Sequence, residues 1–214
     1  MANNRDLMAE QFDDPKQEHE ASTLGMWVFL GTEILFFGVL FAGYIVYRFI
    51  YPEAFAEASR HTNIVLGTIN TALLLTSSLT MALAVRSIQL GKNRLTAGLL
   101  LLTSLLGMIF IGIKGFEYYE EYKKQLVPGL NFTYEGPHVP QVRLFFYLYF
   151  VMTGVHALHL IIGSLAAMTI AVMAWRKSFS ARYFTPVELT GLYWHFVDII
   201  WIFLYPFLYL VSRA

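Results

Sequence analysis

Five apolar segments, each long enough to cross a lipid bilayer, alternate with short polar connections along this chain of 214 residues. A spanning helix needs about 20 consecutive apolar residues. The segments lie at about 23–47, 64–85, 95–115, 144–174 and 187–210. Strands of a membrane barrel would instead alternate in polarity over about ten residues, and no such pattern is visible. The sequence therefore predicts an all-α, polytopic membrane protein, with a bundle of five transmembrane helices over residues 22–214 and a polar N-terminal tail over residues 1–21.

The composition supports a membrane protein and excludes several kinds of function. Hydrophobic residues make up 57% of the chain and charged residues only 14%, whereas about a quarter would be charged in a usual soluble domain. Fifteen basic and fifteen acidic residues give a net charge of zero, which does not favour a nucleic-acid partner. The lack of cysteine excludes disulfides, thiolate metal sites and cysteine nucleophiles. The tail has no basic stretch followed by a short apolar core, so we expect no cleaved signal peptide.

The basic residues of the connections predict how the chain crosses the membrane, because lysine and arginine are enriched on the cytoplasmic side. One side carries eight of them: Arg5, Lys16, Arg86, Lys92, Arg94, Arg176, Lys177 and Arg182. The other side carries six: Arg48, Arg60, Lys123, Lys124, Arg143 and Arg213. We therefore expect a multi-pass protein of the cell membrane with its N-terminus in the cytoplasm and its C-terminus outside.

A carboxyl group, that of Glu33, lies about ten residues into the first apolar segment. At that depth the loss of water favours the neutral acid over the carboxylate. Two interpretations follow from this position. The first is a buried, protonated carboxyl that hydrogen-bonds a neighbouring helix. The second is a carboxyl that handles protons and reacts with hydrophobic carbodiimides.

Small and hydroxyl-bearing residues predict where helices pack closely. Gly67, Asn70 and Thr71 lie near the start of the second segment, and Gly154 and Gly163 lie on the fourth. Such residues let two helices approach each other and form hydrogen bonds across the contact. We expect all five to serve helix packing.

Lys114 and Glu117 close the third segment and are three residues apart, which favours an ion pair along one helix. We expect this pair at the membrane interface, with the lysine side chain extended towards the headgroups.

Two histidines, His156 and His159, lie inside the fourth segment, and His195 lies inside the fifth. Three imidazoles raise the question of a zinc, copper or iron site. No carboxylate lies at ligand spacing beside the histidine pair, so we expect neither a metal nor a haem there. Interhelical hydrogen bonds to Glu33, Glu188 or backbone carbonyl groups are the favoured interpretation.

The fifth segment places an aspartate, Asp198, three residues after His195, with Trp194 and Trp201 on either side. A charge near the bilayer centre costs roughly 2.5 kcal/mol or more, so it persists only where it faces protein, water or a partner. At this spacing the two side chains can meet on one face of a helix, two turns from Glu188. The pair is similar to part of a catalytic dyad. No cysteine and no Gly-x-Ser-x-Gly motif supplies a nucleophile, so we predict no catalytic residue.

Several of these motifs resemble subunit III of the haem–copper respiratory oxidases. The string Tyr193-Trp194-His195-Phe196-Val197-Asp198, followed by Trp201, is similar to the closing helix of that family. The string Thr153-Gly154-x-His156-x-x-His159-x-x-x-Gly163 is similar to a second signature, in which the histidines are structural. The same resemblance extends to the residues around Glu33, to Asn70-Thr71-Ala72, to Glu117-Tyr118 and to the spacing from Glu188 to His195.

This resemblance implies an accessory subunit that itself carries no catalytic residue, haem or copper. Such a subunit packs on catalytic subunit I, in a complex with subunit II and other respiratory chains, and supports proton uptake and the durability of the active site. The complex, expected to be an aa3-type cytochrome c oxidase, reduces oxygen to water with electrons from cytochrome c or quinol and pumps protons. Long family members have two further helices that enclose lipids, so this chain resembles the short, five-helix bacterial form. Because of this difference, the resemblance leaves open whether this chain binds phospholipid.

Two other functions fit the same five-helix pattern. One is the related accessory subunit of a nitric oxide reductase. The other is an independent transporter or proton channel built around Glu33 and the histidines. Co-purification with a haem–copper subunit would exclude the transporter, and the haem type and the activity towards oxygen or nitric oxide would distinguish the two accessory subunits.

Overall fold

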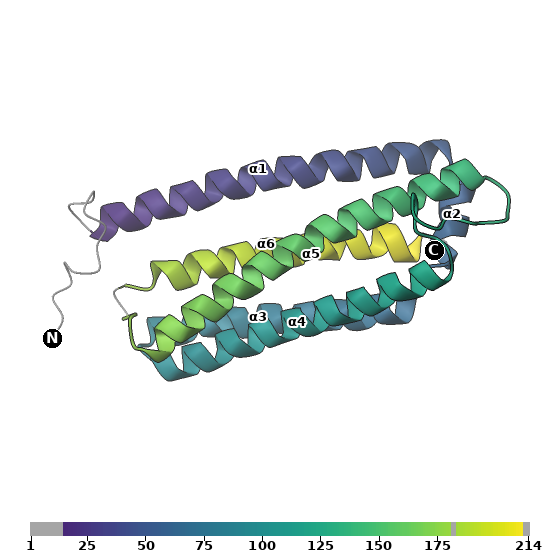
Figure 1. Ribbon diagram of the computed structural model, residues 1–214. Coiled ribbons are helices and arrows are strands. Elements are labelled where there is room, and N and C mark those ends of the chain that lie inside the picture. The colour runs from purple at the N-terminus through teal and green to yellow at the C-terminus, as the bar shows by residue number, and fades with distance from the viewer. Residues whose placement is uncertain (1–14, 181–182, 212–214) are drawn as a thin grey trace.

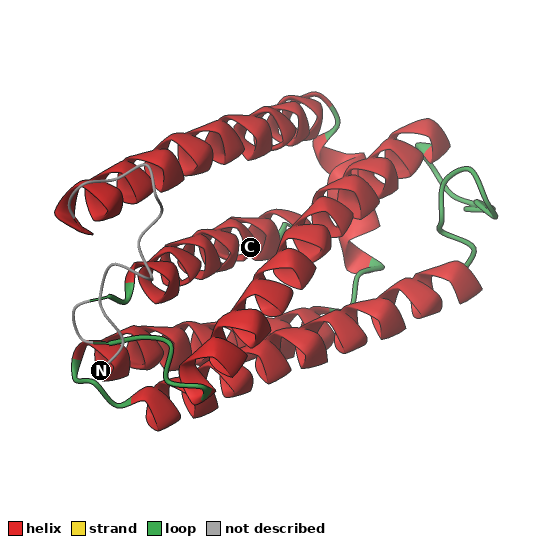
Figure 2. Ribbon diagram, turned by 60° about the vertical axis from the view of Figure 1, so that its left-hand side comes forward, coloured by secondary structure: helices red, strands yellow, loops and turns green. Residues whose placement is uncertain are grey.

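Six α-helices account for most of the described residues, and five of them are long and apolar enough to cross a membrane. The computed structural model describes residues 15–180 and 183–211 (Figure 1). The helices are α1 (Pro15–Ile50), α2 (Pro52–Arg60), α3 (Ile64–Gln89), α4 (Asn93–Lys123), α5 (Val139–Trp175) and α6 (Thr185–Tyr205), which continues into a π-helical turn, η2 (Pro206–Leu210). Within these residues there is no strand (Figure 2), and the prediction of an all-α bundle with five membrane-spanning helices is confirmed.

The helices extend past the apolar segments, because polar residues beyond the hydrocarbon layer can remain helical. α1 begins at Pro15 and so includes residues 15–21, which the sequence analysis placed in the tail. Glu18 in its first turn favours this start, since an acid is stabilised by the positive end of the helix dipole. α4 continues to Lys123, and α5 begins at Val139 with a proline in its first turn, where a missing N–H costs least.

The short helix α2 was not predicted from the sequence. Pro52 at its start and Glu53 in its first turn are both typical of a helix N-terminus. One face buries Ala54, Phe55 and Ala58, mainly against α5. Its nine residues are too few to span a membrane, and it lies at the end of the bundle where α1 ends (Figure 1).

α6 is the central helix of the bundle and α1 is the peripheral one. α6 packs against α1, α3 and α5, while α3 and α4 lie side by side as an antiparallel pair (Figure 1). Within the apolar window of each helix, 56% of the α6 residues are buried but only 17% of the α1 residues. α1 therefore turns most of its surface towards whatever surrounds this chain in the membrane.

The connections lie at two opposite ends of the bundle. The start of α1, the turn between α3 and α4 and the loop between α5 and α6 share one end (Figure 1). α2, the loop of residues 124–138 and the turn η2 share the other. Of the basic residues used to predict orientation, Arg5, Arg182, Arg213 and the side chain of Lys16 lie outside the described part of the chain.

Several close helix contacts occur where a glycine faces an aromatic ring. A carbon added at Gly67 would lie 3.0 Å from two tyrosine rings near the end of α6, and one at Gly163 would lie 3.2 Å from a tyrosine ring of α6. Gly107, which the sequence analysis did not select, is tighter, because its added carbon would lie 2.8 Å from Trp194. At Gly154 the nearest atom would be 3.8 Å away, which is ordinary contact. Side chains at the first three positions would push α6 away from its neighbours.

Candidate functional site

Three groups of polar side chains inside the bundle contain residues that the sequence analysis selected. The first lies between α1 and α5, the second between α3 and α6, and the third near the end of α4. Their members are Glu33 and His159; Ser78, His195 and Asp198; and Lys114, Glu117, Tyr149 and Tyr209.

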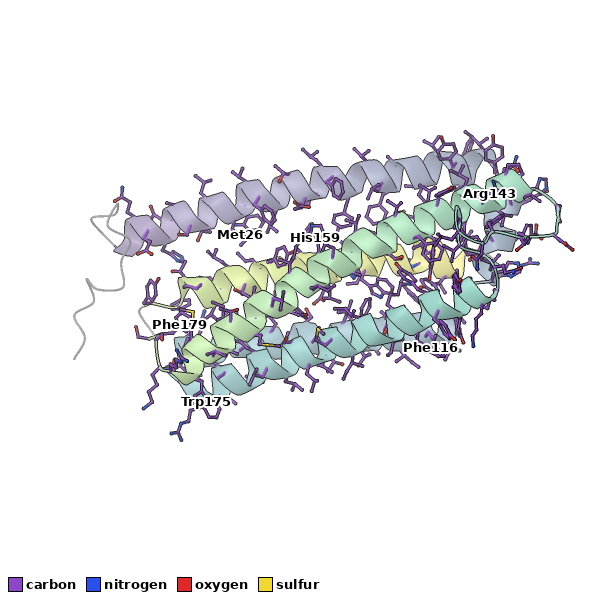
Figure 3. The ribbon with its side chains drawn as sticks, viewed as in Figure 1. Met26, Phe116, Arg143, His159, Trp175 and Phe179 are labelled. Atoms are coloured by element: carbon purple, nitrogen blue, oxygen red, sulfur yellow. The ribbon has the colours of Figure 1, made fainter. Side chains whose placement is uncertain are left out.

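Glu33 joins the peripheral helix α1 to His159 on α5, which is labelled in Figure 3. The distance is 3.1 Å between Oε2 of the carboxyl and Nε2 of the ring. The other ring nitrogen, Nδ1, lies 2.9 Å from the carbonyl oxygen of Val155. A carbonyl only accepts, so Nδ1 must carry a proton. The bond to Glu33 then requires one further proton, either on the carboxyl or on the ring. In both cases the pair is neutral overall, as a neutral acid beside a neutral ring or as an ion pair.

This pair lies at the wall of a pocket between α1, α5 and α6. The pocket has a volume of about 430 Å³, and its other lining residues are mostly apolar: Met26, Phe29, Ile162, Ala166, Leu189, Thr190 and Tyr193. The side chain of Glu33 is 19% exposed and that of His159 is 14% exposed. Glu33 is therefore bonded to a neighbouring helix, and this chain covers most but not all of its side chain. Because α1 packs loosely on the bundle, the carboxyl group stays within reach of molecules in the membrane.

Glu188 lies at the end of the bundle that holds the start of α1. Nδ1 of His19 lies 3.1 Å from the hydroxyl of Thr185 and 4.0 Å from the Glu188 carboxylate. The side chain of Glu188 is 35% exposed. None of the three histidines of the bundle interior uses it as a partner in the described structure.

His195 and Asp198 do not pair with each other, so the expected contact within α6 is wrong. Nδ1 of His195 lies 2.8 Å from the hydroxyl of Ser78 on α3. Asp198 is 3% exposed, and neither of its carboxylate oxygens has a hydrogen-bond partner within the described residues. Ser78 also lies close to Asp198. The partner of His195 is therefore the hydroxyl of Ser78 on α3, and not the carboxylate of Asp198 that the spacing along α6 had suggested.

The two tryptophans on either side of this group fix α6 against α3. Trp194 donates from Nε1 to the hydroxyl of Ser77 at 3.1 Å, and Trp201 donates to the hydroxyl of Thr71 at 3.0 Å. A buried indole N–H needs such an acceptor. Because the two bonds lie seven residues apart on α6, they set both the rotation and the register of this helix pair. Asn70, selected with Thr71, is buried without a hydrogen bond on its amide within the described residues.

Lys114 and Glu117 form an ion pair, as predicted, with 2.9 Å between Nζ and Oε2. The ammonium group of Lys114 also donates to the hydroxyls of Tyr149 and Tyr209, at 2.9 and 2.5 Å. Tyr209 in turn donates to Oε1 of Glu117 at 2.7 Å. All three ammonium protons therefore have an acceptor. We call these four residues the lysine cage.

Contrary to the expectation, the lysine side chain does not extend towards the headgroups. Lys114 is 2% exposed and Glu117 is 0% exposed. The lysine side chain is therefore enclosed by the protein. Its charge is stabilised inside the protein by the lysine cage and by the ring faces of Tyr149 and Trp201, whose centroids lie 4.6 and 5.5 Å from Nζ.

His156 lies three residues before His159 but has different surroundings. It is 1% exposed between the rings of Phe110 and Trp201, with centroids 5.6 and 5.2 Å away. Neither of its ring nitrogens has a hydrogen-bond partner in the described part of the chain, so the hydrogen bond expected for it is not found. The three histidines face different neighbours, and among residues 15–180 and 183–211 no three His, Asp or Glu side chains gather as a metal site.

Comparisons with known proteins match nearly the whole chain. Residues 4–213 match the family model described as cytochrome c oxidase subunit III. The "probable quinol oxidase subunit 3" of Staphylococcus aureus (strain USA300) is 27% identical over 202 residues, which cover 94% of each chain. The "heme-copper oxidase subunit I+III" of Aeropyrum pernix is 30% identical over 192 residues, which cover 87% of this chain and 22% of that longer protein.

Proposed function

This chain belongs to the cytochrome c oxidase subunit III family, and we propose that it is the non-catalytic subunit III of a proton-pumping haem–copper terminal oxidase that reduces oxygen to water in aerobic respiration. The observation that carries the proposal is the family match over residues 4–213. The names of both relatives describe subunits of oxidases, which supports the same assignment.

The bonding of the interior side chains supports a structural use. Both ring nitrogens of His159 are engaged, by Val155 and by Glu33. The ammonium group of Lys114 has an acceptor for each of its protons. Groups that are already bonded within the fold would have to break those bonds before acting on a substrate. We therefore assign the haem and copper of the complex to its other subunits.

Subunit I of the oxidase is the proposed main partner, with subunit II and other respiratory chains completing the complex. The name of the A. pernix relative places subunits I and III in one chain, and this supports contact between the two. The exposed apolar side of α1, with Leu35 at 72% and Val39 at 73%, provides surface for lipid or for another helix.

We assign the Glu33–His159 pair a supporting role in proton uptake. The pair holds one proton that can lie on either partner, and the pocket beside it reaches the surface of the bundle. Moving that proton between carboxyl and ring leaves the pair neutral. This matters in a membrane interior, where an uncompensated charge is costly.

The proposed orientation places the start of α1 in the cytoplasm and the turn η2 outside. The support is the count along the sequence, eight lysine and arginine residues on the side of the α1 start against six on the other. Because the chain has no cysteine, a cysteine introduced at Lys92 or at Glu135 would be a unique label within it. A membrane-impermeant maleimide added to intact cells should label the second and not the first.

The type of terminal oxidase depends on its electron donor, for which there are two candidates. The resemblance favours an aa3-type cytochrome c oxidase, whereas the name of the S. aureus relative favours a quinol oxidase. The purified complex should be assayed for oxygen consumption with reduced cytochrome c and with a reduced quinol. The donor that supports turnover decides between them.

The proposal as a whole is tested by purifying the tagged chain from its native membranes. We expect a haem-containing subunit I to co-purify, and the preparation to consume oxygen. A complex that lacks this chain should start at a similar rate and then lose activity during turnover. Isolation of the chain without any haem protein would refute the assignment and favour a transporter.

A further inference from the structure

Two buried side chains of the bundle, Asn70 and His156, have no hydrogen-bond partner on any of their side-chain polar atoms within the described residues. Asn70 is 0% exposed and His156 is 1% exposed. In proteins the large majority of buried polar atoms have at least one partner, because an unpaired one keeps the full cost of its lost hydration. The amide and the imidazole therefore need partners that the surrounding side chains do not supply.

Both side chains lie at the level of Trp201 on α6, next to the lysine cage. The ring centroid of His156 is 5.2 Å from that of Trp201. Asn70 lies on the buried face of α3, one residue before Thr71, whose hydroxyl accepts the indole N–H of Trp201. Nζ of Lys114 lies 5.5 Å from the centre of the same indole ring. The two unpaired groups therefore belong to one polar region of the interior.

The chemistry of the two groups decides what can pair with them. Because the chain itself encloses these atoms, a neighbouring subunit or a lipid cannot reach them. A direct bond between the amide and the imidazole would still leave one polar atom of each unpaired. The amide has donors and an acceptor, and a neutral imidazole has one of each. A cation would satisfy only the acceptors and an anion only the donors, whereas a water molecule donates and accepts.

We propose that the interior beside Trp201 binds water, which hydrogen-bonds to the amide of Asn70 and to the imidazole of His156. The water extends the polar interior from the lysine cage towards the middle of the bundle. His159, one turn further along α5, does not need it, because Val155 and Glu33 already engage its two ring nitrogens. The inference rests on the fold of this chain alone and holds whichever function the chain has.

Hydroxyl-radical labelling tests the site. X-ray pulses split water throughout a sample, including water bound inside a protein, and the radicals oxidise the side chains beside them. The purified complex in nanodiscs is exposed to such pulses, and the oxidised residues are mapped by peptide mass spectrometry. We expect oxidation of Phe110, which is 0% exposed and whose ring centroid lies 5.6 Å from that of His156.

Two controls use the wild-type chain. Phe37 is the matched residue, because it is 1% exposed and its ring centroid lies 5.3 Å from that of His159, whose nitrogens are both bonded. Its oxidation should stay at background. A radical scavenger dissolved in the bulk solution should suppress oxidation of Tyr119, which is 54% exposed, and leave that of Phe110 unchanged.

Variants identify the groups that hold the water. His156→Phe should lower the oxidation of Phe110 about tenfold, as expected from the loss of hydrogen bonds to the water. His156→Gln keeps a donor and an acceptor and should preserve the oxidation. Ser104→Ala removes a buried hydroxyl that is already bonded, to the carbonyl oxygen of Ser164, and should not change it. Each variant complex should first be shown to contain its subunits in wild-type proportion.

Oxidation of Phe110 no stronger than that of Phe37 in the wild type would overturn the proposal, because the interior beside Trp201 would then be dry. This comparison needs no variant, so it decides the question even where His156→Phe fails to assemble. Equal oxidation of Phe110 in the wild type and in an assembled His156→Phe complex would also overturn it, as would oxidation that the scavenger abolishes.

Discussion

Replacing Glu117 by leucine removes the carboxylate that is hydrogen-bonded to the ammonium group of Lys114 in the interior of the bundle. Lys114 is 2% exposed, and its remaining hydrogen-bond partners would be two neutral tyrosine hydroxyls. Breaking one side of a buried ion pair typically costs about 3–5 kcal/mol. We expect that loss for Glu117→Leu, and a similar loss for Lys114→Met, which leaves the carboxylate with Tyr209 alone as donor.

The double variant, Lys114→Met with Glu117→Leu, should be less damaging than either single change. It removes both charges together, and apolar replacements of a buried pair are often neutral. The hydroxyls of Tyr149 and Tyr209 would keep only each other, so we expect a residual cost of roughly 1–3 kcal/mol. The sum of the two single losses should therefore exceed the loss of the double variant by several kcal/mol, as expected for two side chains in direct contact.

The measurement is the free energy of unfolding of the purified chain in mixed micelles of increasing dodecyl sulfate content. Trp201 reports on the cage directly, since its ring lies 5.5 Å from Nζ of Lys114. Lys123→Met is the matched control, because that lysine lies on the same helix over the ring of Tyr119 and is exposed to solvent; it should change stability by less than about 1 kcal/mol. A double variant that loses the sum of the two single losses would refute the argument, because the charges would then not be coupled.

Three further outcomes follow from the other polar groups. Ser78→Ala should destabilise the chain by about 1–3 kcal/mol, since it leaves a ring nitrogen of His195 unpaired. Asp198→Asn should change the free energy of unfolding little, because no hydrogen bond to the carboxylate is lost. A larger effect of Asp198→Asn than of Ser78→Ala would mean that Asp198, and not Ser78, is the partner of His195. Glu33→Gln should leave initial oxygen consumption of the intact complex largely unchanged and abolish labelling by dicyclohexylcarbodiimide, and immediate loss of nearly all turnover would mean that Glu33 is catalytic. The separated subunit should contain no stoichiometric iron, copper or zinc by elemental analysis, and a full equivalent of any of them would overturn the structural assignment of the histidines.

The number and type of the helices could be predicted from the sequence because length and hydrophobicity are sufficient for that. The Lys114–Glu117 bond could be predicted as well, since it depends only on spacing along one helix. Of the partners on different helices, only Glu33 for His159 was among those predicted. In a membrane protein the face towards lipid and the face towards the core are both apolar, so the pattern does not show how each helix is rotated. The partner of His195, Ser78, is therefore found only from the fold.

The burial of Lys114 was missed for a related reason. The apolar segment ends near residue 115, which suggested a lysine side chain extended towards the headgroups. Instead, Glu117 and Glu121 are both fully buried and take lysine partners, Glu117 with Lys114 and Glu121 with Lys124. Hydropathy measures the average environment of a window, whereas burial of a charge depends on the few residues that contact it. Tyr209, which completes the cage, comes from the far end of the chain.

The peripheral helix α1 is tied to the bundle by polar contacts at three heights. His19 contacts Thr185 near one end, Glu33 contacts His159 in the middle, and the hydroxyl of Tyr44 donates to the carbonyl oxygen of Phe207 near the other. Each tie is directional, so together they prevent α1 from sliding or rotating even though little of its apolar surface is buried. Apolar packing alone could not do this, because apolar side chains interact with lipid tails about as favourably as with another helix. A helix fixed in register but incompletely covered leaves a defined surface, and that surface suits the proposed contact with a partner subunit.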